Sequence, residues 1–258
     1  MLRKFDYPWL LLKRSLWLIL PIAGIGMAEN KLGSQRCNNL VISIQGDSGT
    51  RFLNQMDVRM LVTENGGDPL MGSRLNDVEL HELERRVRRS KLIKKCQIFR
   101  DLRGDVVIEV EQEKPLARWI NSSVNGEVRN TSGYYISDEG VFFPLSDSYS
   151  ARTLLVSGPY FNNPENLKSG EGASLMELLK YLNEDPFWRA QVSELIVDRD
   201  GEISLMTVLG DQVIEFGKAD AYQAKFWKLR TFYNKVLSRD WGRYKRINVK
   251  FQDQIVCE

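Results

Sequence analysis

Histidine and cysteine, the side chains most often used as metal ligands, bases and nucleophiles, are scarce in this chain of 258 residues. His81 is the one histidine, and the cysteines are Cys37, Cys96 and Cys257. Metal sites and Ser-His-Asp or Cys-His pairs need histidine as ligand or base, and the wide cysteine spacing indicates neither a disulfide framework nor a metal knuckle. The sequence therefore predicts no catalytic residue, no metal site and no cofactor, with His81 a solvated helix residue.

The remaining reactive side chains lack the neighbours that catalysis requires. Asp138 and Glu139 are adjacent carboxylates in a predicted hairpin, where such residues favour turn formation over two-carboxylate hydrolysis. Ser157 precedes Gly158 but has no histidine base in its own part of the chain. The sequence has no phosphate-binding glycine loop, no Gly-x-Ser-x-Gly and no His-Glu-x-x-His. We therefore expect a binding protein that is not an enzyme and has no small-molecule substrate.

The charge pattern argues against nucleic acid as a partner. The net charge is +2, and beyond the first 28 residues basic and acidic residues nearly balance, whereas binding to phosphates needs a basic surface. Residues 85–95 are the exception, with seven basic residues in eleven. Glu82 and Glu84 precede Arg86 and Arg88 by four residues, the spacing of helix ion pairs. This basic run is therefore interpreted as a solvated helix end, with a contact to another protein as the alternative.

The amino terminus predicts a membrane anchor. Residues 15–28 are uncharged and apolar after Lys13 and Arg14, and extension back to residue 9 supplies the roughly 20 residues of a spanning helix. The segment is expected to span at 15–30, or at 9–28, with residues 1–14 in the cytoplasm because basic residues stay inside. A cleavable signal peptide ending at Gly26-Met27-Ala28 is the alternative. Both an anchor and a cleavable signal peptide predict that the rest of the chain is exported.

The periodicity beyond the anchor predicts an α+β fold in two parts. After a linker at 31–37, residues 38–112 contain a strand at 40–44, a helix through Leu53 and Met60, a second helix capped by Asn76, and two more strands, a β-α-α-β-β unit. Residues 113–258 predict a mostly antiparallel β domain with two helices, at 175–182 and 222–236. The last predicted strand starts at Ile247 and continues to Ile255.

Four segments resemble a known family in their order and spacing. They are the strand that runs into Glu-x-x-Pro-x-Ala-x-Trp at 92–119, the Asp-x-x-Gly hairpin at 135–142, the Ser-Gly step at 155–158, and the closing strand at 246–251. The chain is similar to the bacterial cell-division family FtsQ/DivIB. The resemblance implies a POTRA domain at 38–112 and an FtsQ-type β domain at 113–258. It also implies an inner-membrane, single-pass scaffold of the divisome with its bulk in the periplasm, which couples early and late septation proteins.

The resemblance also implies partners and the residues that bind them. The family's β domain binds the small coiled-coil membrane proteins FtsB and FtsL, besides other divisome proteins. An edge strand can recruit a partner strand through its unpaired backbone groups, although an ordinary C-terminal edge strand would have the same sequence. The candidate partner-binding residues are Arg199, Arg246, Asn248, Lys250, Phe251, Asp253 and Ile255. The alternative function is a POTRA-containing component of outer-membrane protein assembly or secretion, which is disfavoured because such proteins normally carry several POTRA units.

Overall fold

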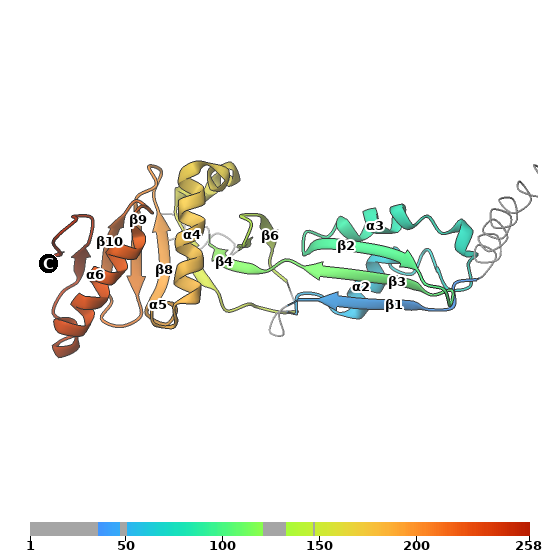
Figure 1. Ribbon diagram of the computed structural model, residues 1–258, viewed down its shortest axis with the longest axis horizontal. Helices are drawn as coiled ribbons and strands as arrows, with labels where there is room; N and C mark the ends of the chain where they lie inside the picture. Colours follow the sequence, from blue (N-terminus) through green and yellow to red (C-terminus); the bar gives the residue numbers. More distant parts are fainter. Residues whose placement is uncertain (1–35, 47–50, 121–132, 147) are drawn as a thin grey trace, which may run out of the picture. The chain divides into compact units, whose positions relative to one another are not determined.

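The chain forms two compact units (Figure 1). The computed structural model describes residues 36–46, 51–120, 133–146 and 148–258. Unit 1 contains the chain up to Gln45 together with Leu53–Gln112, and unit 2 contains Gly46–Phe52 together with Glu113–Glu258. The expected anchor at 15–30 or 9–28 and the cytoplasmic segment 1–14 lie outside the described residues. Among the helices of the described part, none has both the length and the apolar character that a membrane crossing requires.

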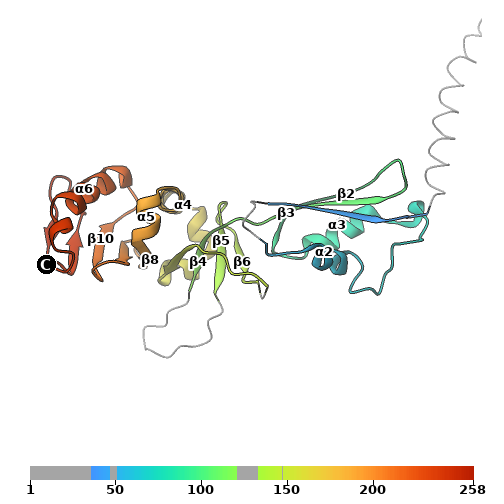
Figure 2. The same cartoon turned by 90° about the horizontal axis from the view of Figure 1, so that it is seen from below.

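Unit 1 is a three-stranded sheet with two helices on one of its faces (Figure 2). Strand β3 lies in the middle, parallel to β1 and antiparallel to β2. Alternation puts Val106, Ile108 and Val110 of β3 into the core at 0–1% exposure, as the period of a strand requires. The order confirms the predicted β-α-α-β-β unit: β1(Leu40–Gln45), α2(Gln55–Val62), α3(Leu80–Arg88), β2(Ile93–Arg100) and β3(Val106–Gln112).

Two details of unit 1 differ from the expectations. Helix α3 begins at Leu80, and Asn76 lies instead in a single 3₁₀ turn, Leu75–Asp77. Leu75 and Val78 are buried there at 1% and 5% exposure, which holds the segment as a turn and delays the helix. Cys37, expected in a linker, is 2% exposed, and its backbone N–H donates to Ser73 O at 2.8 Å.

The basic run at 85–95 is largely neutralised within unit 1. The predicted helix pairs are confirmed, with Arg86 Nε 3.4 Å from Glu82 and Arg88 Nη2 4.0 Å from Glu84. Arg86 also contacts Asp68 at 2.7 Å and is only 15% exposed. His81, by contrast, is 98% exposed, as expected of a solvated helix residue.

Unit 2 is built on one nine-stranded sheet with the order β12-β11-β10-β9-β8-β7-β4-β5-β6. Three neighbouring pairs are parallel (β4–β7, β7–β8 and β10–β11), and the other five are antiparallel, which confirms a mostly antiparallel sheet. The strands are β4(Pro115–Trp119), β5(Tyr134–Ser137), β6(Phe142–Pro144), β7(Leu154–Ser157), β8(Val192–Val197), β9(Ile203–Thr207), β10(Val213–Gly217), β11(Arg246–Asn248) and β12(Val256–Cys257).

Helices cover one face of this sheet (Figures 1 and 2). They are α4(Gly170–Glu184), α5(Pro186–Gln191) and α6(Tyr222–Lys235). The expectation of two helices in this part of the chain is therefore wrong, because the described residues form three. Helix α5 has six residues, too few for an apolar period to show. It forms because Asp185 caps it, accepting from the N–H groups of Phe187 and Trp188, and because the fully buried Trp188 anchors it to the core.

The core of unit 2 includes an aromatic residue from the segment between β1 and α2. Phe52 is 1% exposed, and its ring lies 5.2 Å from that of Tyr135, 5.7 Å from Phe143 and 5.4 Å from Tyr149. The carbonyl of Phe52 also accepts from Ser146 Oγ at 3.3 Å. Residues far apart in the sequence thus form one aromatic cluster.

Candidate partner-binding edge

One edge of the sheet of unit 2 is formed by β12, at residues 256–257. Strand β12 pairs antiparallel with β11, placing Cys257 opposite Ile247 and Val256 opposite Asn248. Glu258 O extends this pairing by accepting from the N–H groups of Lys245 and Arg246 at 2.7 and 3.1 Å. Since β12 is the terminal strand in the sheet order, its outer side is the edge that a partner strand would meet.

The predicted continuous strand from Ile247 to Ile255 is wrong, because residues 249–255 form a loop between β11 and β12. Lys228 of α6 explains the loop. Its Nζ lies 3.1 Å from Val249 O, 3.3 Å from Gln254 O and 3.4 Å from Gln252 O, and it also donates to Phe251 O. Carbonyls turned toward one ammonium are not available to a strand ladder.

The ammonium of Lys228 is partly buried beneath the loop 249–255. Burial, and after it the charge of Lys225, lower the pKa of Lys228, while Asp253 acts in the opposite direction. The periodicity of α6 gave no reason to single out Lys228, since it lies between the apolar positions. Sequence analysis therefore missed the residue that organises the C-terminal loop.

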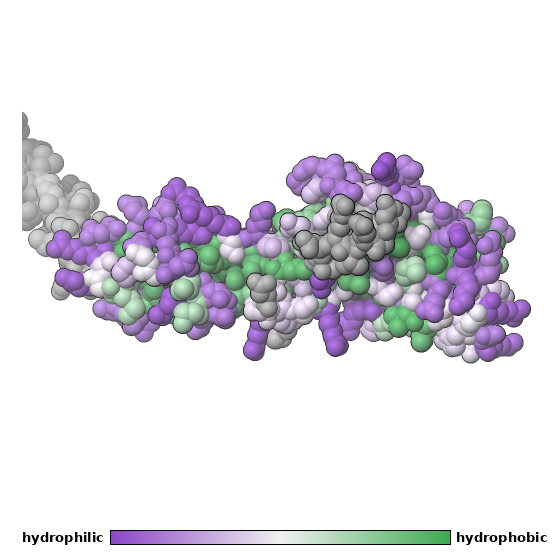
Figure 3. Space-filling view, turned by 180° about the vertical axis from the view of Figure 1, so that it is seen from behind, coloured by the Kyte–Doolittle hydropathy of each residue, from purple (hydrophilic) through white to green (hydrophobic). Residues whose placement is uncertain are grey.

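Three of the candidate residues are freely presented. Phe251 is 49% exposed, Asp253 is exposed, and Arg199 is exposed on the turn between β8 and β9. Trp227, which precedes Lys228 on α6, is 73% exposed. Figure 3 shows the molecule from behind the view of Figure 1, and on that face hydrophobic residues lie among hydrophilic ones.

Lys250 joins the loop to the turn that carries Arg199. Its Nζ lies 2.7 Å from Glu202 Oε2, and the hydrogen bond to Glu202 raises the pKa of Lys250. Glu202 follows the turn at Asp198–Gly201 directly. The structure therefore brings the C-terminal loop and the β8–β9 turn side by side, although about fifty residues separate them in the sequence.

Arg246 and Asn248 are engaged by a carboxylate of the neighbouring strand. Asn248 Nδ2 donates to Glu215 Oε2 at 2.8 Å, and the guanidinium of Arg246 contacts Glu215 Oε1. These bonds fix the start of β11 against β10, so both residues have a structural role. Ile255 packs partly buried against the core cluster. Glu215 and Glu202, which hold this edge in place, were not among the predicted residues.

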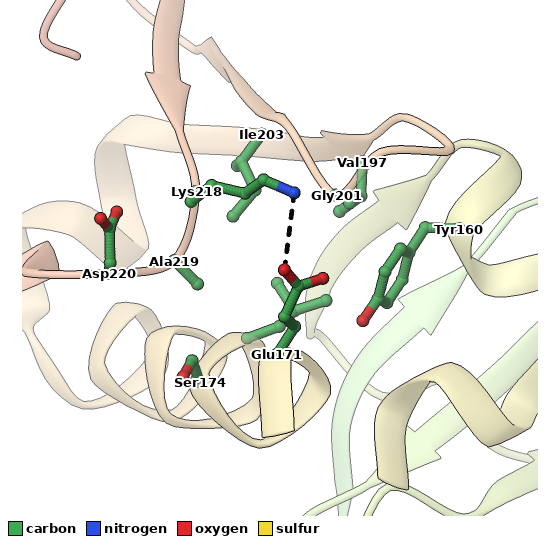
Figure 4. A pocket seen from close by; sticks show the side chains of 10 residues that line it. Tyr160, Glu171, Ser174, Val197, Gly201, Ile203, Lys218, Ala219 and Asp220 are labelled. Carbon is green, nitrogen blue, oxygen red and sulfur yellow. Dashed lines mark ion pairs between the residues drawn. The ribbon is translucent and has the colours of Figure 1, made fainter. Parts of the chain in front are cut away.

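A cavity of about 250 Å³ lies near the same turn. Lys218 Nζ is 3.8 Å from Glu171 Oε1 across it (Figure 4), and Lys218 also donates to Asp200 O. The hydroxyl of Ser174 is bound to Gly170 O at 3.4 Å. Within the described residues, no group of three His, Cys, Asp or Glu side chains could hold a metal ion.

Comparison with known families identifies the kind of protein. Residues 126–258, more than half of the chain, match the family model described as FtsQ/DivIB, C-terminal related. The chain belongs to this family. Residues 35–111 match the POTRA-like domain, so this FtsQ/DivIB-related chain combines both parts that the resemblance implied. Both are scaffold-type, non-enzymatic families, and the match indicates a divisome-related role. The search of curated proteins finds no match.

Proposed function

We propose that this FtsQ/DivIB-related chain is a scaffold of the divisome that binds a small coiled-coil bitopic protein of the FtsB/FtsL type. Binding occurs at the edge formed by β12 and the loop 249–255, and it couples early and late septation proteins. The proposal rests on the family match and on one structural observation: the nine-stranded sheet ends in a two-residue strand whose outer side has no neighbouring strand among the described residues.

The mode of binding is strand addition. A short edge strand offers unpaired backbone groups to a partner, and the side chains beside it give specificity. Phe251 supplies an exposed aromatic anchor next to this edge, and Arg199 and Asp253 supply charges of opposite sign. Aromatic anchors typically dominate binding energy, whereas exposed charges at the rim contribute mainly to specificity.

The membrane arrangement is part of the same proposal. Residues 15–30, or 9–28, form a single membrane-spanning anchor, with residues 1–14 in the cytoplasm and both units in the periplasm. A bitopic partner would then meet the edge on the same side of the membrane. An outer-membrane assembly role is not favoured, because the match over residues 126–258 is to a cell-division family.

The test is co-purification from cell membranes with full-length variants. Deletion of 247–258 would be a poor choice, because Ile247 and Val249 are fully buried core residues. Phe251→Glu and Asp253→Arg change exposed side chains and leave the core intact. Leu102→Glu is the matched control, since Leu102 is 84% exposed in unit 1.

We expect the small bitopic partner to co-purify with the native chain and with Leu102→Glu, and to be lost with Phe251→Glu. Equal recovery with all variants would place the partner elsewhere and reject the site. If a folded, membrane-bound native chain recovers no such partner, the scaffold function itself is rejected.

A further inference from the structure

A second candidate site lies in unit 2, at the start of the parallel strands β7 and β8. Two neighbouring cavities, of about 440 and 590 Å³, share Arg152, Thr153, Asn183 and Arg189. The two cavities therefore adjoin, and together they are called the groove here. It is separate from β10–β12 and from the residues assigned above to partner binding, so it goes beyond the proposed function.

The smaller cavity is positively charged. Arg152 and Arg189 are its charged lining residues, and no carboxylate lines it. Both arginines are exposed, and within the described part of the chain neither makes an ion pair or a side-chain hydrogen bond. A guanidinium presents a planar fork of N–H donors that matches a carboxylate. Two unengaged guanidinium groups at one cavity therefore favour an anionic ligand.

Two of the residues that line the same cavity have buried polar atoms without a hydrogen-bond partner. Trp188 is fully buried, and its indole Nε1 forms no hydrogen bond. The hydroxyl of Thr153 is likewise buried without a partner. Buried polar groups are nearly always hydrogen-bonded, so two such atoms on one cavity call for an explanation. An indole N–H can only donate, so a partner of Trp188 Nε1 has to be an acceptor.

Asn183 adds a hydrogen-bond acceptor to these donors. Its Nδ2 donates to Leu116 O and Leu179 O, both at 2.9 Å, so its Oδ1 is oriented by two fixed bonds and can accept. The site thus offers donors at Trp188 and Thr153 and an acceptor at Asn183. A peptide backbone has both complementary groups, the C=O and the N–H.

The larger cavity carries charges of both signs. Lys114 and Lys180 line it together with Asp138 and Glu184, so two basic residues balance two acidic ones and a short acidic peptide meets no net repulsion there. A nucleic-acid backbone has no N–H group that could donate to Asn183 Oδ1, whereas a peptide backbone has one at nearly every residue.

We propose that this groove binds an extended acidic peptide of a partner protein. A Glu or Asp carboxylate of the peptide pairs with Arg152 and Arg189. A backbone carbonyl of the peptide accepts from Trp188 Nε1, and a backbone N–H donates to Asn183 Oδ1.

The test uses the full-length protein in detergent micelles and two blocked peptides, acetyl-hexaglutamate-amide and acetyl-hexaglutamine-amide. Binding is measured by calorimetry, and the indole N–H resonance of Trp188, assigned with Trp188→Phe, reports the site. We expect hexaglutamate to shift that resonance and hexaglutamine to bind at least tenfold more weakly.

Two double variants separate the groove from general attraction of charge. Arg152→Gln/Arg189→Gln is expected to weaken hexaglutamate binding at least tenfold. Lys235→Gln/Arg239→Gln removes the same charge from exposed positions outside both cavities and is expected to change it less than twofold. Equal losses in the two variants, or no shift of the Trp188 resonance, would overturn the proposal.

A third variant and two small anions complete the test. Thr153→Val keeps the side-chain shape while removing the unpartnered hydroxyl, so the free protein should be at least as stable as the native one and yet bind hexaglutamate more weakly. Glutarate or inorganic phosphate binding as tightly as the peptide would reject a peptide ligand. Phe251→Glu should bind hexaglutamate normally, so failure here is distinct from failure of the proposed function.

Discussion

Lys228 shows how one charged side chain can shape a binding surface without belonging to it. Its ammonium binds carbonyls on both sides of Phe251, so the presentation of Phe251 depends on a residue more than twenty positions away. A lysine on a helix surface is ordinarily expected to be solvated. Lys228 differs because the loop 249–255 folds back over it.

Lys228→Met should release the loop, because it removes the ammonium and keeps an unbranched side chain that is only one atom shorter. A hydrogen bond contributes about 1 kcal/mol net, so amide hydrogen exchange at 249–255 is expected to rise about fivefold. Exchange measured by mass spectrometry on the full-length protein checks this. Lys235→Met, at an exposed position of the same helix, should leave the loop unchanged; similar exchange in both variants would contradict the role of Lys228.

Cys96 gives unit 1 a defined dependence on pH. Burial, and after it the charge of Glu84, raise the pKa of Cys96 to about 11 from the usual 9.0. The folded state therefore keeps the thiol protonated while the unfolded state ionises. The free energy of unfolding of unit 1 is therefore not reduced by Cys96 below pH 9. It falls as the pH rises from 9 toward 11, and the loss is about 2 kcal/mol at pH 10.5.

Pulsed alkylation of Cys37 in a denaturant series measures this, because Cys37 is buried in unit 1 and becomes reactive when the unit unfolds. Between pH 8 and 10.5, the native chain should lose about 2 kcal/mol more stability than Cys96→Ala. Parallel losses in the two proteins would show that Cys96 is not the titrating group.

At the scale of elements, the thiol of Cys257 in β12 can report on partner binding. Ile255 and Cys257 pack against the core cluster, so displacement of β12 by a partner would expose them. Addition of a partner strand outside β12 would leave them in place. Addition therefore costs less, and we expect the partner to slow the reaction of Cys257 with a thiol reagent.

The measurement compares labelling of Cys257 in the free and partner-bound protein. Cys37 and Cys96 serve as internal controls, because both are buried in unit 1 at 2% and 1% exposure. Faster labelling of Cys257 on binding would indicate displacement of β12 and reject addition.

Gly158 fixes the crossing between β7 and the following turn. Its φ is +106°, and a Cβ at this position would lie 2.1 Å from Val197 O of the adjacent strand β8. Gly158→Ala must therefore shift a backbone strand and is expected to destabilise unit 2 by at least about 3 kcal/mol. Gly170→Ala, where the added carbon would meet nothing within 4 Å, should be nearly neutral in the same thermal-unfolding experiment.

Elements were more predictable from the sequence than the site was. The β-α-α-β-β order of unit 1 was predicted correctly, because local periodicity alone determines its strands and helices. The C-terminal loop was misread as a strand since Ile247, Val249 and Phe251 do alternate. The carbonyl contacts of Lys228 that break the strand come from a distant helix, and no local pattern encodes them. The same is true of Glu202 and Glu215.

At the scale of the whole molecule, Phe52 belongs to one unit by its place in the sequence and to the other by its packing. It lies between β1 and α2 of unit 1, yet it packs on Tyr135, Phe143 and Tyr149 in unit 2. Phe52→Ala should therefore destabilise unit 2, by about 3–5 kcal/mol for loss of a buried phenylalanine.

The two units have different reporters, which makes this prediction testable in one sample. The described tryptophans all lie in unit 2, at 119, 188, 227 and 241, whereas Cys37 reports on unit 1. With Phe52→Ala, the fluorescence transition should move to lower denaturant and Cys37 alkylation should move much less. A shift confined to Cys37 would contradict the assignment.

The placement of Phe52 also bears on how such a chain can be made and recombined. During synthesis the segment 46–52 leaves the ribosome more than eighty residues ahead of Tyr135, so its aromatic ring must wait for its binding partners. A gene fusion that exchanged residues 36–112 as a cassette would remove a core side chain from the unit that it left untouched. A successful exchange would therefore have to carry a large aromatic residue at the position of Phe52.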